Sequence, residues 1–128
     1  MPRCRFIDPT REVRYTLSDD DWIVIRRELT VGQLRDLSRS LRRPGETGAD
    51  YAAYPTARVL AYLVAWSFVD AAGNVAPISA GAIDFLEPAT LTEITATLDA
   101  HDAAIDQEKK RTTTNAIVFD PTLQSVGS

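Results

Sequence analysis

The fold of the N-terminal part of this chain rests on residues 11–27, which have the sequence REVRYTLSDDDWIVIRR. Apolar and polar side chains alternate as far as Leu17, and the later run WIVI is dense in apolar and β-branched residues. Between them, the run SDDD consists of residues that favour turns. The pattern predicts a β-hairpin with strands Arg11–Leu17 and Asp21–Arg27.

A first helix is predicted directly after the hairpin. Thr30 and Gln33 have the spacing of a capping box, in which each side chain binds the other's free backbone N–H. Apolar residues then recur at three- and four-residue steps and predict one apolar face, while the Pro-Gly pair at 44–45 ends the helix. The stripe consists of Val31, Leu34, Leu37 and Leu41. Arg35 and Arg39 lie off it, on a basic face that we interpret as solvated or as a protein contact.

Three further helices are predicted. The second runs from Pro55 to Asp70 and is apolar on nearly all sides, which favours a central position. Ser79 caps a short third helix, Ala80–Leu86. The fourth begins at Pro88 and ends near Arg111.

The fourth helix carries a narrow apolar stripe, here called the seam. Its residues follow a 3-4-3-4 rhythm typical of coiled coils, and they are Leu91, Ile94, Leu98, His101 and Ile105. From Thr112 the helical pattern fails, and residues 112–128 are predicted to form a tail. Either this tail is flexible, or Ile117, Val118 and Phe119 form an extended segment that docks on a partner.

These elements predict a mainly α protein with a small N-terminal β-hairpin, in the α+β class. We expect one domain over residues 1–111, built as a small helical bundle with one long C-terminal helix and an extended tail. The length of 128 residues suits a single core.

Charge is unevenly distributed along the chain. The net charge is −4; residues 1–43 have a basic excess, residues 44–108 have ten acids against a single arginine, and residues 109–128 are slightly basic. Such asymmetry steers charged partners, but it lacks the large basic excess of a nucleic-acid binder. No apolar run is long enough to span a membrane and no signal segment is evident, so we expect a cytoplasmic location.

Residues suited to catalysis are scarce. His101 is the only histidine and Cys4 the only cysteine, and neither has partners at catalytic or metal-ligand spacing. The run Asp19-Asp20-Asp21 lacks the alternating oxygen ligands and the glycine of a calcium loop. We therefore expect no enzyme and no cofactor, and interpret the chain as an interaction protein.

Three stretches support a family resemblance: residues 21–33 (DWIVIRRELTVGQ), 58–70 (RVLAYLVAWSFVD) and 73–79 (GNVAPIS), followed by Ile83–Pro88. In this order they resemble the tail assembly chaperones of long-tailed bacteriophages and prophages, over about residues 10–108. The resemblance implies a helical protein without a cofactor that binds the hydrophobic tape-measure protein in the host cytoplasm. It would keep that protein soluble while tail-tube subunits polymerise around it, and it would be absent from the finished particle.

Two alternatives stay open at this level. One is a structural component of the virion, such as a tail-tube or head–tail connector protein, whose C-terminal arm binds neighbouring subunits. The other is a small enzyme or ligand-binding domain, which would need buried acids clustered around His101. The protein partners expected are the tape-measure protein, the tail-tube protein or further copies of the chain. The residues expected to contact them are the seam, Arg35, Arg39, Ile117, Val118 and Phe119.

Overall fold

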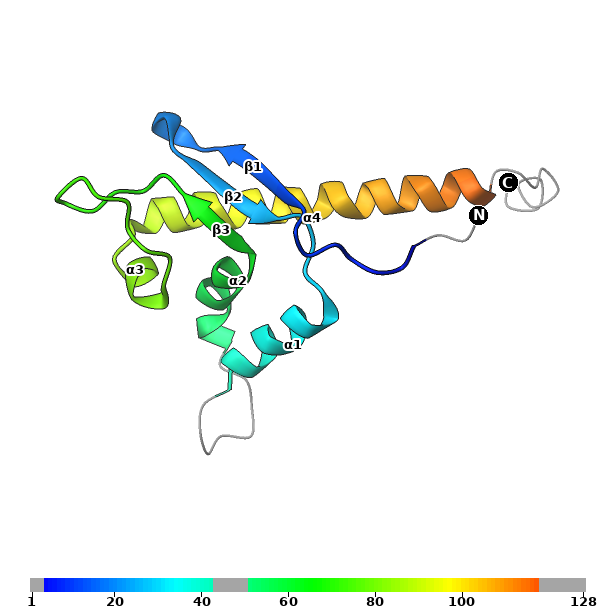
Figure 1. Ribbon diagram of the computed structural model, residues 1–128, viewed down its shortest axis with the longest axis horizontal. Coiled ribbons are helices and arrows are strands. Elements are labelled where there is room, and N and C mark those ends of the chain that lie inside the picture. The colour runs from blue at the N-terminus through cyan, green and yellow to red at the C-terminus, as the bar shows by residue number, and fades with distance from the viewer. Residues whose placement is uncertain (1–3, 43–50, 118–128) are drawn as a thin grey trace. The chain divides into compact units, whose positions relative to one another are not determined.

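The computed structural model describes residues 4–42 and 51–117 (Figure 1). The chain divides into two compact units, Met1–Thr95 and Ala96–Ser128, with the boundary inside the long helix α4 (Pro88–Ile117). Over the described residues, four α-helices and a three-stranded sheet give the α+β class that the sequence predicted.

The predicted hairpin is confirmed. Strands β1 (Glu12–Thr16) and β2 (Trp22–Arg26) pair antiparallel, with Tyr15 opposite Ile23. The short 3-10 segment Ser18–Asp20 makes the turn, and its two aspartates adopt left-handed backbone angles. Aspartate tolerates this region better than most residues because its short polar side chain can hydrogen-bond locally.

The second predicted helix is corrected by the structure. Helix α2 (Tyr54–Tyr62) ends well before Asp70, and the chain continues directly into strand β3 (Leu63–Trp66). This strand pairs antiparallel with β2, so β2 becomes the central strand of the order β1-β2-β3. A run that is apolar at every position has no period that distinguishes helix from strand, and pairing with β2 satisfies backbone groups that the hairpin leaves open.

The segment after β3 turns back on itself. Val69 and Val75 form an isolated antiparallel bridge, and Gly73 has a φ of 85°. Asp70 accepts hydrogen bonds from the backbone N–H groups of Ala72 and Asn74. Gly73 therefore serves a tight turn.

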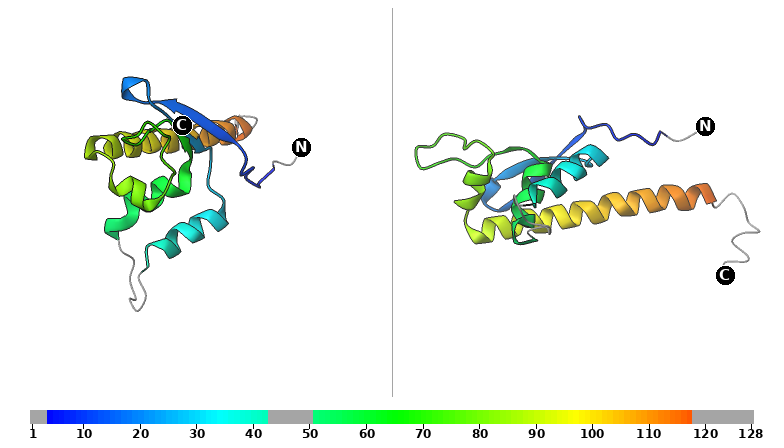
Figure 2. Two further views of the ribbon diagram at one scale, coloured as in Figure 1. Left: turned by 60° about the vertical axis from the view of Figure 1, so that its left-hand side comes forward. Right: turned by 90° about the horizontal axis from the view of Figure 1, so that it is seen from below.

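The helix starts agree with the predicted caps. Helix α1 (Val31–Ser40) begins with the Thr30–Gln33 capping box, and helix α3 (Ala80–Asp84) begins with Ser79, which accepts a hydrogen bond from the N–H of Ala82. In the ribbon views, α1 lies beside α2, and α2 also contacts α3 (Figures 1 and 2).

Helix α4 continues past Arg111 to Ile117, so the prediction that the helical pattern fails at Thr112 is wrong. Threonine and asparagine have low helix propensity, but extending an existing helix avoids the cost of nucleation. Asp106 and Lys110, four residues apart on this helix, form an ion pair at 3.1 Å. Val118 and Phe119 lie outside the described residues.

The core of the first unit is formed by the sheet and the helix residues that face it. Ile23 and Ile25 of β2 are wholly buried, as are Val59 of α2 and Ile94 at the start of α4. Glu93 links the start of α4 to the hairpin turn, because its carboxylate accepts hydrogen bonds of 2.9 Å from both the N–H and the hydroxyl of Ser18. Within residues 4–42 and 51–117, no helix combines the length and apolarity needed to cross a membrane.

Candidate protein-binding groove

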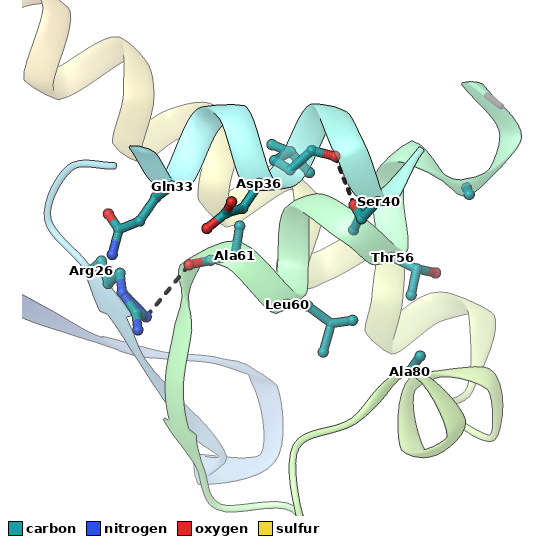
Figure 3. Close-up of a pocket in the computed structure, with 11 residues that line it drawn as sticks. Arg26, Gln33, Asp36, Ser40, Thr56, Leu60, Ala61 and Ala80 are labelled. Carbon is teal, nitrogen blue, oxygen red and sulfur yellow. Dashed lines mark hydrogen bonds between the residues drawn. The ribbon is translucent and has the colours of Figure 1, made fainter. Parts of the chain in front are cut away.

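An open groove lies between α1 and α2 in the first unit (Figure 3). Its volume is about 500 Å³, which is within the range of small-ligand pockets and is also room for a few side chains of a partner. Both helices, the end of β2 and the start of α3 contribute to it. The lining residues are Arg26, Gln33, Asp36, Leu37, Ser40, Ala53, Thr56, Ala57, Leu60, Ala61 and Ala80.

The α2 wall of the groove is made mainly of small residues. Ala53, Ala57 and Ala61 are spaced four residues apart, so they share one side of the chain. Leu60 adds aliphatic surface to the same wall, and Leu37 faces it from α1. Small side chains keep the groove open and let a partner approach the backbone of α2 closely.

The polar residues of the α1 wall are mostly engaged with near neighbours. The side-chain oxygen of Gln33 accepts from the N–H of Thr30 at 2.8 Å, and Asp36 pairs with Arg39 at 3.2 Å. The hydroxyl of Ser40 donates to the carbonyl of Leu37 at 2.7 Å. These local bonds hold the α1 wall in place, and the apolar floor is left to contact a partner.

The apolar stripe predicted for α1 is largely exposed. No residue of Val31–Ser40 is buried. Val31 is 69% exposed and Leu34 is 49% exposed, whereas Leu41, just past the helix, is buried. Leu37 belongs both to this stripe and to the groove, so the exposed residues and the groove share a boundary.

The residues that the sequence analysis selected for binding fall into different settings. Arg35 and Arg39 lie exposed on α1 as expected. In the seam, Ile94, Leu98 and His101 are buried, and Leu91 and Ile105 are half-buried. Ile117 is the last residue of α4, and Val118 and Phe119 lie beyond the described part of the chain.

Sequence reasoning missed most of the groove. Arg26 was assigned only to a strand. The groove-facing residues of α2 could not be distinguished in a predicted helix that was apolar on nearly all sides. The four-residue spacing of the alanines was the available signal, but small residues at that spacing are also common inside packed helix pairs.

In the described part of the chain, no three His, Cys, Asp or Glu side chains gather where they could hold a metal ion. Cys4 is exposed, and its thiol donates a hydrogen bond of 3.8 Å to the carbonyl of Phe6.

Comparison with protein-family models finds no match, and neither the curated proteins nor the solved structures contain one.

Proposed function

We propose that this chain is a protein-binding assembly chaperone that covers an apolar helix of its client. The observation that carries the proposal is the exposed stripe of α1, where Val31 and Leu34 face solvent beside the groove that Leu37 lines. Leaving such side chains in water forgoes a favourable transfer of apolar surface, which a partner helix laid into the groove would recover.

We further propose that the client is the tape-measure protein of a long-tailed bacteriophage, as the sequence resemblance implies. A tape-measure protein is a long, hydrophobic chain that aggregates unless its apolar stripes are covered. The chaperone would act in the host cytoplasm and leave before the particle is complete.

Charge on α1 supports a polar rim around the client site. Arg35 and Arg39 flank the exposed stripe, and Arg42 follows just beyond the helix. Exposed charges at the rim of an interface mainly speed association and orient the partner.

Co-expression with the tape-measure protein encoded in the same genome tests the proposal. We expect a soluble complex, and we expect Leu34→Glu to weaken it by roughly tenfold or more because a charge would be buried at the contact. Val75→Glu is the matched control, since Val75 is 64% exposed but lies on the distant turn after β3. That variant should bind like the original chain.

Two results would contradict this function. One is the absence of a complex together with unchanged solubility of the client. The other is mass spectrometry of purified particles that finds many copies of the chain per virion, which would instead favour the structural tail-tube or connector alternative.

A further inference from the structure

Arg26 lies at one end of the groove, and no residue in the described part of the chain forms an ion pair with it. Its half-buried side chain comes from the last residue of β2, and Nη1 reaches the carbonyl of Ala61 at 3.5 Å (Figure 3). This contact is long, and a guanidinium has five N–H donors to satisfy. Glu12 lies opposite Arg26 in the β1–β2 register, but over residues 4–42 and 51–117 no ion pair to Arg26 is formed.

The groove residues near Arg26 offer one free donor group and one carboxylate that already has a cationic partner. Gln33 lies at the same end of the groove, and its side-chain oxygen is taken by Thr30, which leaves its NH₂ group as a donor (Figure 3). Asp36 is the nearest groove carboxylate, and its charge is offset by the ion pair with Arg39. This end of the groove is therefore suited to accept a carboxylate.

The rest of the groove is suited to aliphatic side chains. Leu37, Leu60 and the alanines of α2 form its floor. A ligand that matches the whole groove combines aliphatic groups along the floor with one carboxylate at the Arg26 end. An amphipathic helix meets this requirement, because residues three and four apart share a face and an acidic residue can stand at its edge.

We infer that the groove binds an apolar helix of the partner through a specific ion pair between Arg26 and an aspartate or glutamate of that helix. This inference rests on the proposed function and adds the chemistry by which the client is recognised. The planar guanidinium can hold a carboxylate with two parallel hydrogen bonds, which sets the register of the bound helix.

Synthetic peptides test the pairing without the full client. The probes are amphipathic helical peptides with one leucine stripe, in which a single glutamate is placed in turn at each position beside the stripe, and the same peptides with glutamine there. At the matching position, we expect the glutamate peptide to bind the full chain about tenfold more tightly than its glutamine counterpart.

The decisive variant is Arg26→Gln. If Arg26 holds the carboxylate, the preference for glutamate disappears in this variant while the glutamine peptide binds unchanged, which is the signature of direct coupling in a double-mutant cycle. Arg26→Lys should keep part of the preference, since it retains the charge and loses the two-pronged geometry. Arg14→Gln is the control: Arg14 lies exposed in the same sheet, over the ring of Trp22, and its loss should leave the preference intact.

Thermal unfolding of each variant shows whether it is folded before its binding is measured. If Arg26→Gln does not fold, Arg26→Lys takes its place in the comparison. A glutamate preference that persists in Arg26→Gln, or that is absent from the original chain, overturns the inference and leaves the proposed function standing. Failure of every peptide to bind also overturns it. The proposed function is judged separately, by the tape-measure complex.

Discussion

Strand β2 and helix α1 follow each other along the chain, but they differ in whether their apolar residues are buried. Ile23 and Ile25 of β2 are fully buried, whereas Val31 and Leu34 of α1 are exposed. Both segments have an unambiguous apolar pattern in the sequence. The difference teaches that periodicity identifies the apolar face of an element but not whether the rest of the fold covers it. In this chain the uncovered face borders a groove, which makes it the candidate contact surface.

The two regions should differ most in the free energy of unfolding that is lost when an apolar side chain is replaced by alanine. Ile25→Ala removes buried methyl and methylene groups and should lower the free energy of unfolding by about 2–5 kcal/mol, whereas Leu34→Ala should change it by roughly 0.5 kcal/mol or less. Urea unfolding of both variants measures the contrast. Equal losses would mean that Leu34 is packed in solution, and the exposed-stripe argument would fail.

The Thr30 cap should affect the local stability of α1 more than the stability of the rest of the fold. Thr30→Ala removes the acceptor for the N–H of Gln33 and should destabilise α1 by about 1 kcal/mol. Because α1 contains no buried residue, we expect this loss as faster hydrogen exchange of the α1 amides, with little change at β2. Equally accelerated exchange in both elements would show that they unfold as one unit.

A substitution in the hairpin turn should have a smaller effect, and it should raise the free energy of unfolding rather than lower it. Asp20 has a φ of 64°, which glycine adopts without steric cost, so Asp20→Gly should raise the free energy of unfolding by roughly 0.5 kcal/mol. Asp21→Gly is the control, because Asp21 has a negative φ and accepts a hydrogen bond from Ser67 at 2.8 Å. The control should be destabilised. Thermal melts that rank the two variants the other way would contradict this account.

The smallest effect concerns the exposed segment ahead of β1. Hydrogen bonds from the hydroxyl and N–H of Thr10 stabilise the ionised carboxyl of Asp8 and lower its pKa. Because the folded pKa lies below the unfolded one, the contribution is present above about pH 4 and is lost as the pH falls through the folded pKa. Carboxyl titration by NMR should show the lowered pKa, and Thr10→Val should raise it. An unchanged pKa in Thr10→Val would exclude the hydroxyl as its cause.

The candidate site was only partly accessible to sequence reasoning. The α1 stripe and its flanking arginines were recognised, but its exposure could not be read from the spacing of its residues. The seam was expected to be a contact surface, and three of its residues, Ile94, Leu98 and His101, are buried. The groove itself joins Arg26, Leu37 and Ala61, which come from three elements, and no spacing along the chain predicts that they meet.

What the sequence alone established is local. The hairpin, the Thr30 and Ser79 caps and the Asp106–Lys110 pair each depend on residues a few positions apart, where backbone geometry leaves few choices. Tertiary structure settled whether Leu63–Trp66 is a strand or part of a helix, because the exposed edge of β2 had to find a partner. It also settled which apolar faces are covered. Burial depends on how all the elements compete for a limited core, and the hydrophobic period of one segment does not predict the outcome.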